Sequence, residues 1–424
     1  MALGFEALAA RFGVLVTARR NMVAGLSDAA LASLATFAVG IFAVRTLDPA
    51  LLGGYALCYQ AIFLVGIIPA NLLFTPAEVA VVAFPRGERL GHLGQSLRLG
   101  ALPAAAAALL VTLWVAVAPN ELPAEAIRAL TVTAVATAFL SPVQDHVRRM
   151  LHSGGASWCA AIVSAVQLLV VAVVLALHKQ LSISVWWIPF GALALANGAS
   201  LVIALLCAGR RWAGRPGAER LRAGELVRAG RWLVGWSLLS PAAGFIAAAI
   251  VSRTAGAEAL GYAEGARVVA QPVWVLAVGL SSVLGPLSMA AGRERSERSA
   301  RRVSRGFMWT VGAAGLTCML AFGMEWRGNV LSWLLPTAYA VNGLVLVTLL
   351  AQTATGLLFP YRSELLGARR EAPLTKLEII ASALRVVMAG TARATHAFAI
   401  PLGYLAVGIA RGIGYKAILR TVYR

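Results

Sequence analysis

A few charged side chains fall inside long apolar stretches of this sequence, and they are the residues best placed to carry chemistry. Asp28 lies about two turns into the first stretch, Glu264 and Arg267 share a later one, and Arg385 lies in another. A charge near the centre of a bilayer costs at least about 2.5–3.5 kcal/mol, so these side chains should face protein or a water-filled cavity. An arginine binds phosphate oxygens bidentately. The pattern predicts anion binding by the arginines and ion coupling by the carboxylates.

Each of these residues also has a structural interpretation. Glu264 precedes Arg267 by three residues, so the two can pair on one helix face, and Arg267 can also extend to the outer surface. Arg385 follows Glu378 by seven residues on one helix face, where it contacts substrate or locks that helix to a neighbour. The dipole of a helix N-terminus equally explains Asp28. Both interpretations stay open at each position.

The segment that begins at Arg253 has an internal copy that begins at Arg45. Both copies read Arg-Thr, a short turn, Gly-Tyr-Ala and a further apolar stretch, provided that one residue is dropped before Gly54 and Gly261. Self-similarity of this kind indicates duplication of a structural unit. We therefore predict a chain of two related halves.

The alignment of the copies predicts a shared site. Gln60 and Arg267 each follow a tyrosine of the repeated motif by five residues, so we expect them to face each other across a central cleft and to contact substrate. Arg45 and Arg253 end the first apolar stretch of each half. There they either receive an anionic group or anchor the helices at the membrane interface.

Composition indicates an integral membrane protein. Of 424 residues, 59% are hydrophobic and 13% are charged, whereas soluble proteins average about 25% charged. A helix needs about 20 apolar residues to cross a bilayer. Twelve such stretches are present, at residues 22–44, 53–80, 98–118, 124–145, 157–178, 184–208, 232–253, 261–290, 304–325, 331–360, 374–394 and 398–418.

The predicted fold is an all-α polytopic membrane protein of twelve transmembrane helices in two six-helix lobes. Because each half has an even number of helices, the halves insert the same way up and form a parallel pseudo-twofold repeat. The expected divisions are an amphipathic cytoplasmic segment at 1–20, an N-lobe at 21–208, a basic linker at 209–231 and a C-lobe at 232–424.

The basic residues predict the orientation. They gather in every second loop, which places both termini on the cytoplasmic side of a multi-pass protein in, we expect, a bacterial cytoplasmic membrane. The net charge of +19 is accounted for by this topology, so we expect anionic lipids at the cytoplasmic face and no nucleic acid as partners. The four cysteines all lie in apolar stretches and predict neither a disulfide nor a metal site.

Two parallel lobes around a central cavity are typical of alternating-access transporters. The sequence contains no Ser/His/Asp constellation, Walker loop or zinc motif, so we expect neither an enzyme nor a cofactor.

Three motifs resemble a known family. The turn from Arg45 to Tyr55, the segment from Arg148 to Gly154, and the segment from Trp333 to Tyr339 resemble parts of polysaccharide flippases of the multidrug/oligosaccharidyl-lipid/polysaccharide exporter superfamily. The resemblance implies a V-shaped pair of lobes that moves a polyprenyl-diphosphate-linked oligosaccharide between leaflets, with basic cavity residues holding the diphosphate. This chain departs from that pattern by having few cavity arginines and by having Gln60 where a second basic residue would be expected.

Other functions remain open. A drug/cation antiporter of the same superfamily is expected to hold more buried carboxylates, and a major facilitator transporter also has six plus six helices. A membrane enzyme of polysaccharide assembly needs catalytic groups on a sizeable outer loop, whereas all predicted outer loops here are short. A non-transporting scaffold would have no cavity between its lobes.

Overall fold

A computed structural model describes residues 2–117, 123–209, 221–323 and 330–423 of the chain, with side chains from Val23 onward except at 116, 117 and 282. The N-terminal bundle contains α1 (Ala2–Thr46), α2 (Pro49–Pro69), α3 (Thr75–Val81), α4 (Arg86–Arg89), α5 (Leu93–Val117), α6 (Ala124–Ser153), α7 (Ser157–Leu177) and α8 (Ile188–Ala208). The C-terminal bundle contains α9 (Ala223–Ala255), α10 (Ala257–Arg293), α11 (Glu297–Cys318), α12 (Leu331–Leu334), α13 (Leu344–Gly356), α14 (Phe359–Gly367), α15 (Glu371–Ala389), α16 (Ala392–Thr395) and α17 (Ala399–Val422).

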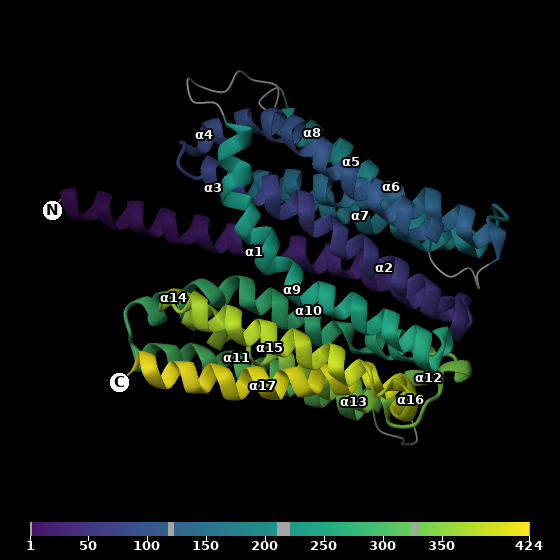
Figure 1. Cartoon of the computed structure of the whole chain (residues 1–424). Helices are drawn as coiled ribbons and strands as arrows, with labels where there is room; N and C mark the ends of the chain where they lie inside the picture. The colour runs from purple at the N-terminus through teal and green to yellow at the C-terminus, as the bar shows by residue number, and fades with distance from the viewer. Residues whose placement is uncertain (1, 118–122, 210–220, 324–329, 424) are drawn as a thin grey trace.

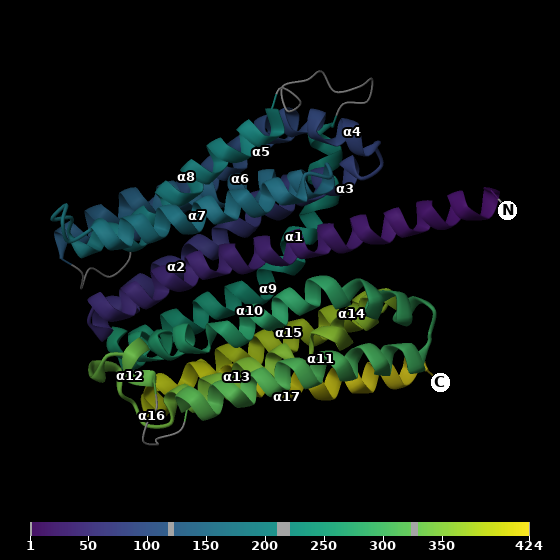
Figure 2. The same ribbon diagram turned by 180° about the vertical axis from the view of Figure 1, so that it is seen from behind.

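The helices of each bundle run roughly parallel to one long direction, and the two bundles lie side by side (Figures 1 and 2). Both chain termini lie at the same end of the molecule, which we call the proximal end. At the opposite, distal end the bundles approach each other, and toward the proximal end they diverge.

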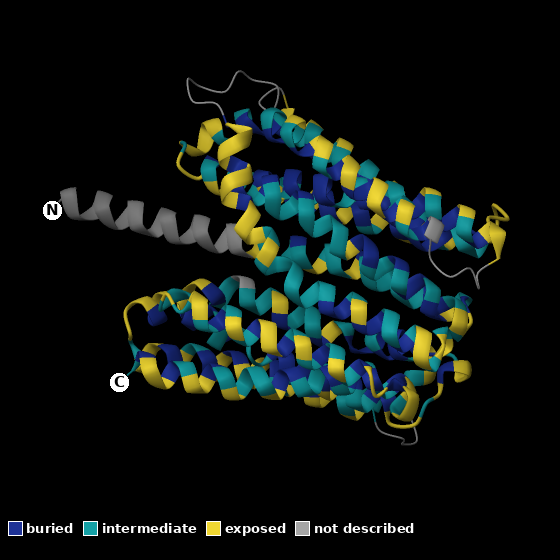
Figure 3. Ribbon diagram, viewed as in Figure 1, coloured by how far each residue is buried: buried dark blue, intermediate teal, exposed yellow. Residues whose placement is uncertain are grey.

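The all-α polytopic fold predicted from the sequence is confirmed. Within the described ranges ten helical segments are long and apolar enough to cross a membrane, and the bent α10 raises this to eleven. The remaining predicted span coincides with α15, whose charged Lys376, Glu378 and Arg385 make it less apolar. Large apolar side chains such as Leu102 and Ile413 are exposed on the outside of the bundles, as lipid contact requires (Figure 3).

The tenth predicted stretch, residues 331–360, begins too early. The structure has the short α12 followed by a turn at Thr337–Tyr339, and the long helical segment starts only at Leu344. Gly343 has a φ of +75°, a left-handed conformation that no helix interior accepts and that glycine adopts without cost from a Cβ. Apolar composition alone did not reveal this break.

Prolines interrupt α2 and α10. A proline cannot bond the carbonyl four residues earlier, and its ring displaces that carbonyl. Pro76 acts in this way on Leu72, which lies in the π-helical turn Ala70–Phe74 that follows α2. In α10, Pro286 acts on residue 282, where the helix bends by 50°. The second long helix of each half is therefore not a straight rod.

The two bundles touch most closely where α2 crosses α10. A Cβ on Gly53 would lie 1.9 Å from the carbonyl oxygen of Ala257, and a Cβ on Gly261 would lie 1.7 Å from that of Pro49. The same sequence offset separates Gly53 from Gly261 and Pro49 from Ala257, so the contact is reciprocal, as two copies of one unit require. The copies therefore align without the dropped residue that matched Gly54 to Gly261.

Two hydrogen bonds close the same distal end. Arg45 Nη1 donates to the carbonyl of Trp333 at 2.8 Å, and Tyr339 Oη donates to the carbonyl of Leu47 at 2.8 Å. Both bonds join the end of α1 to the segment that contains α12. Helix crossing and hydrogen bonds together hold the bundles shut at the distal end.

Helix α9 begins against the N-terminal bundle and ends within the C-terminal one (Figure 1). A Cβ on Gly230 would lie 2.1 Å from the carbonyl oxygen of Leu72, the carbonyl that Pro76 leaves without its helical donor. Gln95 of α5 donates to the carbonyl of Leu221 at 2.7 Å and accepts from its N–H. The last residues of the predicted linker at 209–231 therefore contact the N-terminal bundle, and residues 210–220 lie outside the described ranges.

The predicted amphipathic segment at 1–20 continues into the first span without a break, because α1 is one helix from Ala2 to Thr46. Its side chains lie outside the described residues, so its amphipathic role stays a prediction.

We predict that Gly261→Ala lowers the unfolding free energy by about 1–3 kcal/mol, because the added methyl group forces α2 and α10 apart. Thermal unfolding of the purified protein in detergent measures this. Gly66→Ala is the matched control, since a Cβ at Gly66 in α2 meets nothing within 4 Å. Equal stability of the two variants would contradict the close crossing.

Candidate functional site

Polar side chains meet between the bundles at Glu264 and Arg267 of α10 and Tyr59 of α2, which we call the midplane cluster. Arg267 donates to both carboxylate oxygens of Glu264, from Nε at 2.7 Å and from Nη2 at 2.6 Å. The Arg267 guanidinium carbon lies 5.8 Å from the centre of the Tyr59 ring, within range of a cation–π interaction. The Glu264 side chain is 6% exposed, whereas that of Arg267 is 30% exposed. Arg267 is therefore paired yet still accessible.

The cluster lies about halfway across the membrane. Tyr59 follows Pro49, the first residue of α2, by the same number of residues as Arg267 follows Ala257, the first residue of α10. At 1.5 Å per residue both lie about 15 Å from the distal helix starts, half of a hydrocarbon core of about 30 Å. Charged groups at this depth need partners or water, and the bidentate pair supplies one partner.

The position opposite Arg267 is Tyr59 and not Gln60. Once the copies are aligned without the dropped residue, Tyr59 is the residue that corresponds to Arg267, and the cation–π contact joins these two. Gln60 is half-buried on the same helix, one residue further on. Its substrate role stays a prediction.

Asp28 lies in a second cluster, inside the N-terminal bundle. Its carboxylate accepts from Arg148 Nη1 at 3.3 Å, bonds to His152 Nε2 at 2.9 Å and accepts from Ser164 Oγ at 2.5 Å. These partners come from α6 and α7, so Asp28 ties three helices together. An ion-coupling role requires a cation or proton to compete with Arg148.

Sequence reasoning missed Arg148 and His152 as partners because it ended the fourth span at residue 145. The structure continues α6 to Ser153, about two further turns. Arg148 and His152 are four residues apart and so share a helix face. That spacing was the signal available in the sequence, but it lies beyond the predicted end of the span.

A third polar cluster, also missed, surrounds His146 of α6. Its Nδ1 lies 2.8 Å from Glu78 Oε1 on α3, and its Nε2 lies 2.7 Å from Ser96 Oγ on α5. The Phe74 ring stacks on the imidazole with ring centres 4.4 Å apart. Phe74 ends the π-helical turn beside α2, so this cluster fixes the proline-broken part of that helix.

Arg385 of α15 is buried and makes contacts within its own bundle. Its guanidinium carbon lies 3.9 Å from the centre of the Tyr404 ring, and its Nη1 lies 3.3 Å from the carbonyl oxygen of Ser240. Glu378 does not pair with Arg385, because it accepts from Arg411 Nη2 at 2.5 Å. The contacts of Arg385 lock α15 to α9 and α17.

The two interfacial arginines differ. Arg45 is bonded to the Trp333 carbonyl at the distal end, whereas Arg253 is exposed near the C-terminus of α9. Throughout the described residues no group of three or more His, Cys, Asp or Glu side chains is arranged to hold a metal ion.

These features define a two-bundle polytopic membrane fold with a polar cluster at mid-depth, and known transporters share this fold. An inward-facing multidrug resistance MATE family transporter of the MOP superfamily superposes with a TM-score of 0.67, 13% identity, and coverage of 95% of this chain and 98% of that one. An outward-facing structure of such a transporter gives 0.68 at 13% identity, covering 96% of each chain.

A MOP superfamily transporter from Pyrococcus furiosus, described as having a binding pocket of reverse polarity, gives a TM-score of 0.61 at 15% identity and covers 96% of each chain. No protein-family model and no curated protein sequence matches the chain. The chain thus has the fold of MATE transporters.

We predict that Asp28 and Arg148 are energetically coupled. In a double-mutant cycle of Asp28→Asn and Arg148→Gln, the two changes together should cost less than the sum of the single changes, by about 0.5–3 kcal/mol of unfolding free energy. Chemical unfolding in mild detergent measures the cycle. The exposed pair Arg222 and Glu225, 3.5 Å apart, is the control and should show about 0–0.5 kcal/mol. Additivity at Asp28 and Arg148 would contradict the ion pair.

Proposed function

We propose that this chain is an alternating-access transporter that moves a polyprenyl-diphosphate-linked oligosaccharide from the inner to the outer leaflet of a bacterial cytoplasmic membrane. The fold supports the general class, because it is shared with transporters in both inward-facing and outward-facing forms. The substrate is proposed from the chemistry of the midplane cluster and from the sequence resemblance.

The arrangement of the bundles supports an inward-facing state. Basic residues concentrate at the proximal end, which the positive-inside rule assigns to the cytoplasm. The distal end, closed by the α2–α10 crossing and the Arg45 and Tyr339 hydrogen bonds, then faces outward. Breaking these contacts and closing the proximal end would expose the same cluster to the other side.

Arg267 is the observation that carries the proposed substrate. It is the charged member of the midplane cluster whose side chain stays partly exposed, and it lies beside Tyr59 across the boundary between the bundles. A diphosphate can replace the Glu264 carboxylate as its bidentate partner, since both present paired oxygens. Gln60 is proposed as a further contact on the facing helix. The lipid tail would remain outside the bundles, against the apolar side chains exposed there.

A drug/cation antiporter is the second candidate, favoured by buried carboxylates that composition alone did not reveal. Asp28, Glu264, Glu364 and Glu378 are all buried, as expected of groups that bind protons or cations. Three of them, however, bond to an arginine, namely Arg148, Arg267 and Arg411. An arginine partner keeps a carboxylate ionised and occupies the place of an incoming cation.

We predict that Arg267→Ala slows translocation at least about tenfold, because a lost charge-assisted bidentate contact of about 1.5–3 kcal/mol corresponds to a factor of ten or more. The assay reconstitutes the protein in vesicles and measures which leaflet holds a fluorescent polyprenyl-diphosphate sugar. Arg267→Lys should be partly active, and Arg298→Ala, at the exposed start of α11, should match the unchanged protein. Full activity of Arg267→Ala would remove Arg267 from the site.

Ion gradients distinguish the two candidates. Vesicles with an imposed proton or sodium gradient should show no gradient-driven movement of a cationic dye, since the carboxylates remain paired with arginines. Dye movement that is lost in Asp28→Asn, without translocation of the lipid-linked sugar, would favour the antiporter.

A further inference from the structure

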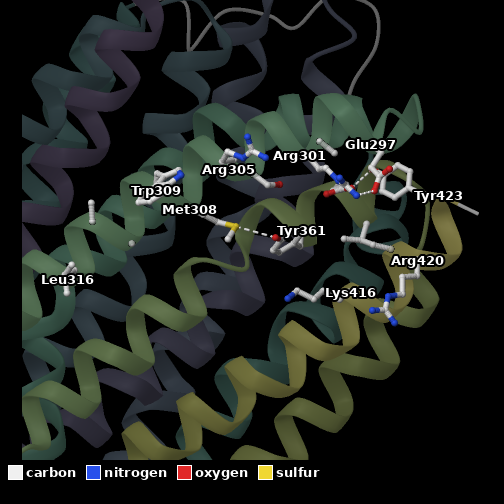
Figure 4. A pocket seen from close by; sticks show the side chains of 16 residues that line it. Glu297, Arg301, Arg305, Met308, Trp309, Leu316, Tyr361, Lys416, Arg420 and Tyr423 are labelled. Atoms are coloured by element: carbon white, nitrogen blue, oxygen red, sulfur yellow. Dashed lines mark hydrogen bonds and ion pairs between the residues drawn. The ribbon is translucent and has the colours of Figure 1, made fainter.

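A groove with a volume of about 1060 Å³ lies in the C-terminal bundle, among α11, α14 and α17. Figure 4 shows side chains from these helices surrounding it. Every residue that lines it belongs to the C-terminal bundle, and none belongs to the midplane cluster or to α9 and α10, which face the other bundle. The groove is therefore separate from the proposed translocation site.

The proximal part of the groove is basic. Arg305 on α11 and Lys416 and Arg420 on α17 are exposed, and no acidic group bonds to any of them within the described residues. Two acidic side chains line the groove: Glu297 pairs with Arg301 at 2.5 Å, whereas Glu364 accepts from the neutral hydroxyl of Tyr423. Arg305, Lys416 and Arg420 together outnumber Glu364, the one lining carboxylate without a cationic partner, so the described lining of the groove carries a net positive charge.

Away from this basic part the groove becomes apolar. Met308, Trp309, Ala313 and Leu316 follow Arg305 along α11, and Trp309 is 74% exposed. At 1.5 Å per residue, the α11 segment from Arg305 to Leu316 is about 16 Å long, close to half of a hydrocarbon core of about 30 Å. Gly312 also lines this part, and the space beside it is open, because a Cβ there would meet nothing within 4 Å.

We propose that this groove is a binding site for an anionic phospholipid of the cytoplasmic leaflet. The phosphate contacts Arg305, Lys416 and Arg420, and one acyl chain lies along α11 as far as Leu316. A basic mouth at headgroup depth and an apolar channel as long as one leaflet match the two parts of such a lipid. A soluble anion would contact only the basic mouth and would leave the apolar channel empty. The inference does not depend on the proposed substrate, because the groove lies outside the midplane cluster.

The test measures binding of phosphatidylglycerol and phosphatidylcholine to the full-length protein in detergent by native mass spectrometry. We expect one phosphatidylglycerol to bind at least about tenfold more tightly than phosphatidylcholine, as three basic contacts predict. The triple variant R305Q/K416Q/R420Q should remove this preference. The control R293Q/R298Q/R302Q loses the same charge from exposed positions that do not line the groove, and it should keep the preference.

A second variant tests the acyl chain without changing any charge. Gly312→Leu should fill the apolar part and weaken phosphatidylglycerol binding, whereas Gly306→Leu, also unobstructed on α11 but outside the groove, should not. Inorganic phosphate should compete only weakly. Equal binding of the two lipids, retained preference in R305Q/K416Q/R420Q, or full displacement by inorganic phosphate would each overturn the proposal. Since both Gly312→Leu and the charge variants leave the midplane cluster intact, leaflet translocation can fail or succeed independently of this result.

Discussion

The backbone crossing of α2 and α10 is the constraint on which the rest of the structure depends. Two glycines let each helix approach the carbonyl of the other within distances that no Cβ tolerates, and they do so reciprocally. This contact fixes the relative position of the bundles at the distal end. It also sets the depth at which Tyr59 meets Arg267. The two helices begin in contact with each other, and each of these residues lies the same number of residues after the start of its helix.

The buried polar side chains described above, Asp28, Glu378 and His146, each have a hydrogen-bond partner on a neighbouring helix. Asp28 is held by α6 and α7, Glu378 by α17, and His146 by α3 and α5. These contacts bind helices together within a bundle. Arg267 differs because its partner is on its own helix and its side chain keeps an accessible surface next to the other bundle. That difference separates a candidate ligand-binding charge from charges that hold the fold.

The all-α class could be predicted from the sequence, and each of the twelve predicted apolar stretches overlaps a helix of the structure. The length of an apolar stretch is a strong signal because a helix must cross the whole hydrocarbon core. The sequence also predicted the Glu264–Arg267 pair as one of two interpretations, since spacing of three residues suffices for that. It could not predict that Glu378 pairs with Arg411 rather than lying near Arg385, because contacts between helices depend on how each helix is rotated. The sequence alignment of the two copies dropped one residue in order to match their Gly-Tyr-Ala motifs. The contact between α2 and α10 shows that Gly53, and not Gly54, corresponds to Gly261.

Helix α9 makes the two copies mechanically unequal. The equivalent helix of the first copy, α1, packs mainly on α7 of its own bundle and meets α10 of the other, whereas α9 places its first turns on the π-helical turn after α2 and its later turns on α15. Because α9 contacts both bundles, a rigid rotation of one bundle about the distal contact would have to bend α9 or break its contacts with the N-terminal bundle. Pro241 and Gly244 lie midway along α9, and a proline is a common place for a helix to bend, so we expect any movement that brings the proximal ends together to require bending there.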